Sequence, residues 1–463
     1  MSGVDKARDE HVPARRRSKA SVRLRERGVN VVPAPKVEKE PREPKLPRHR
    51  WFEPERVPAS ERAQAVIDDV LNQVQNYEKY FALRKRARKQ VDQETFEATV
   101  TALMSDLMFN EVSGEEPGVA ITRSKTKLGR KSRYSSPVLG KILPRVVDLL
   151  CTPEMDFLRQ EKGGQEYFKE NRTTTIYPTE RLASRIYEHE VQIDDLATNK
   201  FRETIVLKRP KTGPFDKGGR IEYEDSPATR RYRDEMKRIN RFLDSADIEF
   251  DDFVVDEEQA VDSQDRRLRR VFTNGSFESG GRLFGGFWQH LKKTERAEGL
   301  RIKGEHIITL DYSQMALRIA YGEVGCQPPP GDGYVLPDLE KYREATKTIF
   351  NSALCSDKRP LRAPKGTREN LPRKIHFMFV LQHLEEHHAP IVPLFYKSEG
   401  HRIQFIESQI LVALLLWLQD QGIVALPIHD AVIIAESDAD TTKKTMEQVF
   451  KEMTRIDGIV RAE

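Results

Sequence analysis

Cysteine is scarce in this sequence, and its scarcity excludes two kinds of architecture. The 463 residues contain three cysteines, Cys151, Cys326 and Cys355, which are far apart and show no Cys-x-x-Cys spacing. This pattern argues against a disulfide framework and against a structural zinc site. It is typical of a protein in a reducing compartment, and we expect the three thiols to be ordinary buried side chains.

Long apolar runs are also missing. The longest, Ile410 to Leu418, is far shorter than the roughly 20 residues that a membrane-spanning helix needs. No stretch near Met1 has the apolar core of a secretion signal. We therefore expect a cytoplasmic protein with no membrane partner, associated with the nucleoid if its host is bacterial.

Charge is abundant, at 33% of residues, and the 38% of hydrophobic residues are enough for two or three domains with real cores. Basic residues are unevenly placed: they gather in the first fifty positions and again between Arg123 and Arg133. Such clusters suit a polyanionic partner such as nucleic acid. The plainer interpretation of any single run, a solvated surface, is the more common case.

The first part of the chain divides by composition. Residues 1–60 are rich in Pro, Arg, Lys and Glu with few apolar residues, which predicts a disordered basic arm. Apolar residues then recur at helical spacing over residues 61–84 and 95–109, with Thr95 as the expected cap of the second helix. We expect these two helices to pack together in a mostly helical domain over residues 61–193.

Within that domain, a basic loop precedes a helix that we expect to be capped at Ser135, Ser136 and Pro137 and to run to Leu149. A β-branched strand follows at residues 173–176. The order resembles a winged helix, in which a short helix enters the major groove and the adjoining hairpin reaches phosphates. A plain helical scaffold is the equal alternative. The candidate nucleic-acid contacts are Arg123, Lys125, Lys127, Arg130, Lys131 and Arg133.

Charged residues dominate residues 194–265, where residues 228–243 are typical of a long surface-exposed helix; this region fits a thumb or a linker. From residue 266 to 463, glycines, aromatics and apolar strands appear. An apolar run from His306 delivers Asp311 at its end and is followed at once by helical spacing. Two β-rich runs, 423–428 and 431–436, flank His429-Asp430, which predicts a hairpin with an aspartate at its tip.

If the strand before Asp311 neighbours this hairpin, both carboxylates face one point. Two-metal phosphoryl transfer requires such a geometry, with ions about 4 Å apart that activate an attacking hydroxyl and stabilise the departing pyrophosphate. Asp311-Tyr-Ser-Gln-Met-Ala-Leu-Arg318 and His429-Asp430 resemble motifs A and C of the family A DNA polymerases. The single-subunit RNA polymerases of phages and mitochondria share this palm.

The resemblance implies an α+β fold, a right-hand polymerase palm and fingers of family A type over residues 266–463. It implies that Asp311 and Asp430 bind two Mg²⁺ ions, with Mn²⁺ as a substitute, and that His429 supports the primer end. It also implies DNA template and primer, with dNTP or NTP, as partners, and a role in DNA replication. The catalytic candidates are therefore Asp311, Asp430 and His429.

The family's motif B, an Arg and a Lys one turn apart that reach the incoming triphosphate, is matched in part by Arg343 and Lys347. The family's aromatic one turn later is replaced by Asn351, with Phe350 beside it, and its Tyr-Gly is replaced by Cys355-Ser356. The resemblance extends to further positions, with weaker motifs. Gln314 and Ala316 are nucleotide-binding candidates; Arg282, Arg318, Glu407 and Gln409 are nucleic-acid-binding candidates.

One departure bears on sugar choice. The family's DNA polymerases carry a glutamate at the place of Ala316, where it crowds a ribonucleotide 2′-hydroxyl, whereas the RNA polymerases carry a small residue. Removing that bulk weakens steric discrimination, so we expect tolerance of ribonucleotides and a possible role in primer synthesis. Ala431 likewise replaces a glutamate common in the DNA polymerases.

Other interpretations stay open. A DNA-binding replication initiator or regulator with an inactive palm is the first alternative, and a template-independent nucleotidyltransferase is the second. His383-Leu-Glu-Glu-His387 matches an inverted zinc-peptidase pattern, but no third ligand follows in context. The glycines at 280, 281, 285 and 286 lack the Lys-Ser/Thr of a phosphate-binding loop and more simply permit tight turns.

Overall fold

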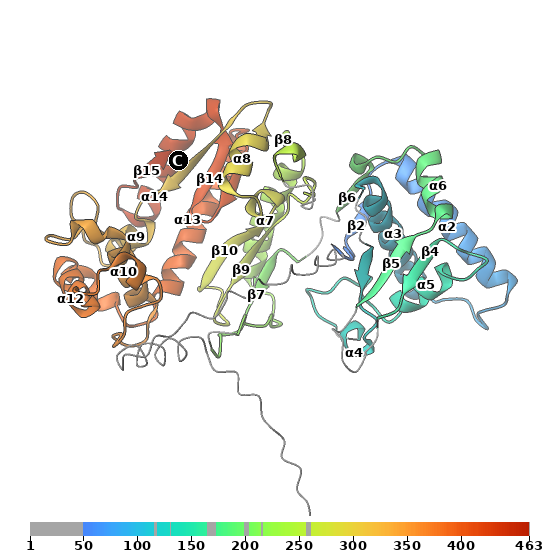
Figure 1. Cartoon of the computed structure of the whole chain (residues 1–463), viewed down its shortest axis with the longest axis horizontal. Helices are drawn as coiled ribbons and strands as arrows, with labels where there is room; N and C mark the ends of the chain where they lie inside the picture. Colours follow the sequence, from blue (N-terminus) through green and yellow to red (C-terminus); the bar gives the residue numbers. More distant parts are fainter. Residues whose placement is uncertain are drawn as a thin grey trace, which may run out of the picture. The chain divides into compact units, whose positions relative to one another are not determined.

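The computed structural model describes residues 50–114, 118–129, 131–163, 173–198, 203–213, 216–255 and 261–462 (Figure 1). Residues 1–49 of the expected disordered arm lie outside these ranges. Residues 50–60 of that arm contradict the expectation, because they contain strands β1 (Arg50–Trp51) and β2 (Arg56–Pro58). Both arginines donate hydrogen bonds to the buried Asp106, at 2.8 and 3.1 Å. These two bonds to a buried carboxylate anchor residues 50–56 to the folded domain.

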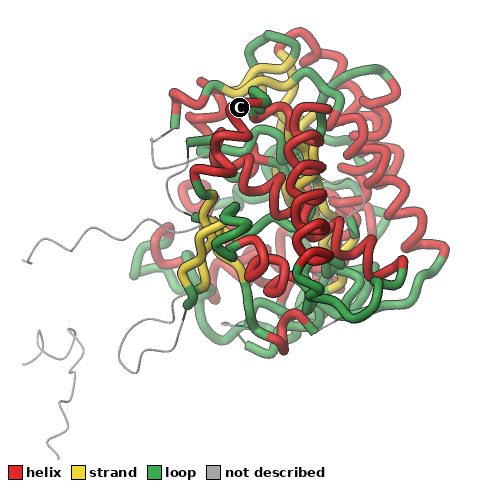
Figure 2. Tube along the Cα trace, turned by 90° about the vertical axis from the view of Figure 1, so that its right-hand side faces the viewer, coloured by secondary structure: helices red, strands yellow, loops and turns green. Residues whose placement is uncertain are grey.

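The described residues form a mixed structure of helices and strands (Figure 2). They contain two separate hydrophobic cores. The first core spans Phe52 to Leu196. Its elements are β1, β2, α2 (Glu61–Tyr80), α3 (Gln90–Val112), β3 (Val119–Ile121), α4 (Lys125–Leu128), α5 (Leu143–Leu150), β4 (Leu158–Glu161), β5 (Thr174–Pro178), α6 (Glu180–Glu188) and β6 (Leu196–Thr198). They include a four-stranded sheet of order β1-β3-β5-β4 and the pair β2-β6.

Helices α2 and α3 confirm the expected helical pair, but the expected cap is wrong. Thr95 lies inside α3, where its hydroxyl donates to the carbonyl of Val91, and the helix begins at Gln90. The helix expected from Ser135 begins only at Leu143, with Pro144 in its first turn. A turn occupies the residues before it, so the expected cap at Ser135–Pro137 is also wrong. The winged-helix interpretation is not confirmed and stays a prediction.

The second core spans Ile205 to Val460. Its strands are β7 (Ile205–Leu207), β8 (Ile248–Phe250), β9 (Leu268–Phe272), β10 (Gly280–Gly285), β11 (Leu300–Ile302), β12 (Ile307–Tyr312), β13 (Ala425–Ile428), β14 (Ala431–Ala435) and β15 (Val460–Ala462). Its helices are α7 (Pro227–Asp244), α8 (Lys293–Gly299), α9 (Met315–Glu323), α10 (Arg343–Cys355), α11 (Thr367–Asn370), α12 (Phe377–His387), α13 (Gly400–Asp420) and α14 (Ala439–Thr454).

Helix α7 differs from the expected surface helix. Its charged residues lie on one face, while Tyr232, Met236, Ile239 and Leu243, three or four residues apart, are buried on the other. Strand β7 pairs in parallel with β9, in a sheet of order β10-β9-β7. Residues from 205 onward therefore share the core that contains the candidate site.

The sheet that carries the two aspartates has the order β13-β14-β12-β15 and is antiparallel throughout. All five residues of β14 are buried, which explains its unbroken apolar sequence. Helix α13 contacts β13, β10 and α14, and α14 contacts β12 and β15. The expected hairpin is confirmed.

Helix α13 is, in the described part of the chain, the one helix long and apolar enough by length and composition to cross a membrane. Half of its apolar window is buried inside the protein. Ile410, Leu414 and Leu418, four residues apart, are completely buried in the second core. Its hydrophobicity therefore fits the central helix of a folded core.

Candidate active site

The two aspartates meet because of strand register. In the antiparallel pair β12–β14, Asp311 lies directly opposite Ala431, so Asp430 is one residue from the opposing position. The backbone N–H of Tyr312 points to the carbonyl of Asp430 at 3.5 Å. Both aspartates are half-buried. Because neighbouring strands lie about 5 Å apart, the register brings the backbones of the two predicted aspartates close together at one end of these central strands.

The hairpin tip between β13 and β14 is short and anchored. Ile428 pairs with Ala431, which leaves only His429 and Asp430 in the loop. His429 is exposed and has a φ of 56°, a left-handed backbone that is uncommon outside glycine. Trp288 and Gln289 both donate to the carbonyl of Pro427, at 3.0 and 2.9 Å. These bonds hold the hairpin against the preceding loop and so fix the position of Asp430.

A third carboxylate lies within electrostatic range. Glu407 on α13 is buried, and Arg282 on β10 donates to it at 2.9 Å. Burial raises the pKa of Glu407; Arg282 partly offsets this, and the negative charge of Asp430 raises it further. Arg282 and Glu407 were expected to contact nucleic acid, and the structure shows them bonded to each other. Gln409, on the same helix, is half-buried.

A buried arginine that sequence reasoning missed supports this region. Arg270 on β9 is completely buried and donates to the carbonyl of Gly281 at 3.1 Å and to the hydroxyl of Ser408 at 2.9 Å. Gly281 has a φ of +82°, and a Cβ there would lie 2.6 Å from that hydroxyl. A glycine is therefore required for β10 to approach α13 beside Arg282 and Glu407.

Arg343 and Lys347 lie at the start of α10, one turn apart, as motif B spacing predicts. Lys347 is exposed and Arg343 is half-buried. Arg343 donates through Nε to Asp332 at 2.7 Å and also forms an ion pair with Glu344. Its guanidinium lies 5.6 Å from the ring centre of Tyr334. The predicted triphosphate-binding arginine is thus already bound by two carboxylates of its own chain.

The loop that carries Asp332 is fastened to the end of the Asp311 strand. Gln314 is buried, has a φ of 58°, and accepts a hydrogen bond from the N–H of Gly333 at 2.8 Å. Its side-chain amide donates weakly to Gly331 at 3.4 Å. The expected direct contact of Gln314 with a nucleotide is therefore replaced by a role in holding this loop.

Three other predicted residues fall in different environments. Phe350 is completely buried against Tyr334 and Phe395, which contradicts a direct contact with a nucleotide. Ala316 is half-buried beside the core, and Asn351 is exposed on α10.

Arg318 is buried and donates to the carbonyl of Asp457 at 2.8 Å, at the turn that leads into β15. The prediction that Arg318 contacts nucleic acid is therefore wrong for this conformation: its guanidinium fastens α9 to the last strand.

The basic residues of the first core also differ from the expectation. Arg123 forms an ion pair with Asp148 at 2.6 Å and a hydrogen bond to Gln160 at 2.9 Å. Arg133 donates to Asp225 at 3.1 Å and lies 3.6 Å from the ring centre of Tyr223. Both arginines therefore have internal partners, which argues against their predicted role as free DNA contacts.

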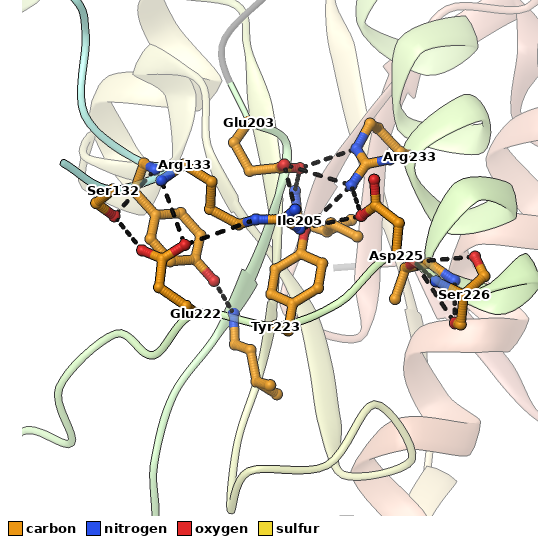
Figure 3. Close-up of polar contacts among 12 residues, drawn as sticks. Ser132, Arg133, Glu203, Ile205, Glu222, Tyr223, Asp225, Ser226 and Arg233 are labelled. Atoms are coloured by element: carbon orange, nitrogen blue, oxygen red, sulfur yellow. Dashed lines mark hydrogen bonds and ion pairs between the residues drawn. The ribbon is translucent and has the colours of Figure 1, made fainter.

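Figure 3 shows the contacts of Arg133 with Glu222, Tyr223 and Asp225. Beside it, the hydroxyl of Tyr134 donates to the carbonyl of Ile221 at 2.9 Å and accepts from the N–H of Leu207 at 3.1 Å. Lys125, Lys127 and Lys131 are exposed, and Arg130 lies outside the described residues.

Cysteines and metal-ligand clusters complete the description. Cys326 and Cys355 are exposed and Cys151 is half-buried, so the expectation of buried thiols is wrong for two of the three. Within the described ranges, no group of three or more His, Cys, Asp and Glu is arranged to hold a metal ion. His383 on α12 contacts the backbone carbonyl of Phe379 in its own helix at 3.0 Å.

No protein-family model matches the chain, and no curated protein matches it. Among solved structures, the chain is similar to the polymerase domain of Pol1 from M. smegmatis in complex with DNA primer-template and dNTP. The TM-score is 0.30 and the identity 10%, over 80% of this chain and 65% of that chain. A similarity this low carries no argument about function, which therefore rests on the site's geometry.

Proposed function

We propose that the protein is a template-directed nucleotidyltransferase whose reaction centre is the pair Asp311 and Asp430. The observation that carries the proposal is the register of β12 and β14, which places two half-buried aspartates one residue apart at the same end of neighbouring strands. Asp311 lies at the end of an apolar strand, and Asp430 lies in the His-Asp loop of a hairpin. Their backbone proximity is a long-range feature, since 118 residues separate Asp311 from Asp430 in the sequence.

The donor set fits divalent cations such as Mg²⁺. Mg²⁺ is usually held by one or two carboxylates together with substrate phosphates and waters, and Asp311 and Asp430 supply two carboxylates. The charge of Asp430 also contributes to the raised pKa of the neighbouring Glu407, which shows negative charge concentrated here. When bound, such ions would lower the pKa of an attacking hydroxyl and neutralise charge on the departing pyrophosphate.

The remaining groups of the chain would position the reactants. A primer 3′-oxygen would form a bond to the α-phosphorus as the bond to the pyrophosphate oxygen breaks. Arg343 and Lys347 lie on one face of α10, and both would neutralise the triphosphate. The exposed His429 at the hairpin tip would support the primer end. Catalysis would come from positioning and electrostatics, without a covalent intermediate.

Sugar selection would be weak. Position 316 carries a methyl group where the resembling DNA polymerases carry a glutamate, so little bulk opposes a 2′-hydroxyl. We propose that ribonucleotides are accepted and that the product includes primers. Comparable extension of a primer with NTPs and dNTPs supports this; strict dependence on dNTPs contradicts it.

The test is incorporation of labelled dNTPs and NTPs on a primed DNA template with Mg²⁺. Asp430→Asn and Asp311→Asn should each lower incorporation at least about 100-fold, because several kcal/mol of transition-state stabilisation are lost. Asp440→Asn is the matched control, because Asp440 is exposed on α14. EDTA should abolish the native activity, and Mg²⁺ or Mn²⁺ should restore it.

The outcome also separates the alternatives. Addition that ignores the sequence of a homopolymer template would indicate a template-independent nucleotidyltransferase. If no variant and no native protein incorporates nucleotide while all bind DNA equally, the proposal fails, and the DNA-binding initiator or regulator becomes the better account.

A further inference from the structure

One segment between α10 and α12 carries as much net charge as the whole protein. Residues 357–376 contain seven Lys or Arg and two Asp or Glu, so their formal charge of +5 equals that of all 463 residues. The other residues are therefore neutral in sum. A patch this concentrated attracts a polyanion, whereas a solvated surface ordinarily mixes both signs.

Most of these cations are available. We call the following six side chains the fingers basic surface, because they are exposed and have no acidic partner among residues 50–462 where the chain is described: Lys358, Arg362, Lys365, Arg368, Arg373 and Lys374. The seventh, Arg359, forms an ion pair with Glu385 on α12 at 2.6 Å. The available charges therefore point to a partner outside the protein.

The backbone under this surface is fixed. Arg359 and Tyr396 both donate to Glu385, and the N–H of Ser398 donates to the carbonyl of Ser356 at 2.9 Å. Thr367 and Leu371 are buried, which holds the short helix α11. Because the segment is held at several points, a partner would not have to order it on binding.

Apolar and aromatic side chains accompany the charges. Leu361 is 87% exposed and Phe379, on the first turn of α12, is 49% exposed. The ring of His383 lies 4.0 Å from that of Phe379, one turn further along. An open hollow of about 750 Å³ lies between residues 355–362 and Ser398. Exposed aromatic rings beside cations are the combination that binds single strands, since bases stack and phosphates pair.

We propose that the fingers basic surface, together with Phe379, binds the single-stranded part of a nucleic acid. This deepens the proposed function: the strand would be the unpaired template approaching the reaction centre. Helix α10 joins the two places, since its first residue is Arg343 and the basic segment follows its last turn. Its 13 residues span about 20 Å, a distance that a few nucleotides cover.

The binding test uses the full chain and fluorescein-labelled dT20, read by fluorescence anisotropy from 50 to 300 mM salt. R373Q/K374Q should weaken binding about tenfold and lower the slope of log Kd against log salt by about 1.4, because two phosphate contacts are lost. The control K443Q/K444Q removes an adjacent exposed pair of equal charge on α14 and should leave both quantities unchanged.

Phe379→Ala tests the stacking half of the proposal. It should weaken dT20 binding about fivefold or more without changing the salt slope, because stacking involves no counterion release. A 20-base-pair duplex should lose less affinity than dT20 in each variant.

If R373Q/K374Q and K443Q/K444Q lose equal affinity for dT20, or if neither loses any, the proposal that the fingers basic surface binds nucleic acid is wrong. A loss confined to the duplex overturns the choice of a single strand. Repeating the binding in Asp430→Asn keeps the result independent of catalysis, so this inference and the proposed function fail separately.

Discussion

Arg343 has two acidic neighbours before any nucleotide arrives. Asp332 accepts from its Nε at 2.7 Å, and Glu344 pairs with Nη1. These partners hold the pKa of Arg343 above its usual value, against the effect of burial. If Arg343 binds a triphosphate, the phosphate must first displace Asp332, so the carboxylate competes with the substrate.

We predict that Asp332→Asn lowers the KM for nucleotide about three- to tenfold and leaves kcat nearly unchanged. The substitution removes a carboxylate that competes with the triphosphate for Arg343, an interaction of order 1 kcal/mol. The asparagine oxygen can still accept from the N–H of Tyr334, as the aspartate does at 3.0 Å. Steady-state kinetics of nucleotide incorporation measure this. Asp338→Asn, in the same loop, is the control; an unchanged or higher KM for Asp332→Asn shows that Asp332 positions Arg343 and does not compete.

For single residues, the sequence predicted a position correctly where the neighbouring residues along the chain determine it. Asp311 ends an apolar strand and Asp430 sits between two, so pattern alone placed both. Arg318 and Gln314 were assigned to ligands because their protein partners are remote: Arg318 bonds to Asp457 and Gln314 to Gly333. A polar side chain's partner depends on tertiary packing, which a linear pattern does not contain.

At the scale of elements, His388 connects the end of α12 with helix α9 and with the loop that contains Gly333. It follows α12, is completely buried, and contacts the hydroxyl of Tyr321 on α9 at 2.9 Å and the carbonyl of Gly333 at 2.7 Å. The carbonyl requires a proton on Nε2, so neutral Nδ1 accepts from Tyr321. Burial lowers the pKa of His388 to about 4, despite the bond to Gly333, and the nearby His387 lowers it slightly further.

This pKa predicts acid sensitivity. Because the folded state disfavours protonation, the contribution of His388 is complete above pH 6.5 and is lost as the pH falls from 6.5 towards 4. The loss in free energy of unfolding is up to about 3 kcal/mol. Urea unfolding at pH 7.5, 6 and 5 should show a shallower decline for His388→Gln, which is also less stable at pH 7.5. The exposed His290→Gln should keep the native profile; parallel profiles for His388→Gln would contradict the prediction.

Element types followed from periodicity more reliably than their limits did. The pattern over residues 61–84 gave α2, and the alternation of apolar residues around His429-Asp430 gave the hairpin. The start of α3 was misplaced because three of the four residues of its first turn, from Gln90, are polar and the turn has no side-chain cap. For α7, charge density concealed the buried stripe of Tyr232, Met236 and Ile239, since solvent-facing residues outnumber it.

Over the whole molecule, a charged network connects the two cores. Arg133 contacts Asp225 and Tyr223, and Arg56 pairs with Asp262 at 2.8 Å. The basic run that contains Arg133 indicated nucleic acid in the sequence, but part of it serves this internal junction. Sign and density of charge predict that a partner exists, and the fold decides whether it belongs to the same chain.

We predict that Arg133→Ala loosens this junction without unfolding either core, because its ion pair with Asp225 is exposed to solvent and therefore weak. Hydrogen exchange should become faster at residues 132–134 and 205–207 and stay unchanged in β12. Lys131→Ala, which removes an exposed neighbouring cation, should show native exchange. Faster exchange throughout the second core would instead indicate that Arg133 supports folding itself.

The hydroxyl of Tyr134 has a consequence for solubility. Strand β7 ends its sheet, and an edge strand offers unpaired backbone groups to any other strand that approaches. Here Leu207 accepts from the N–H of Ile221 and donates to Tyr134, whose own proton goes to Ile221. The hydroxyl of Tyr134 thereby occupies the N–H of Leu207, a backbone group with which a strand of a second chain could otherwise pair. The turn that contains Tyr134 therefore covers one edge of this sheet, where a strand of a second chain could otherwise pair.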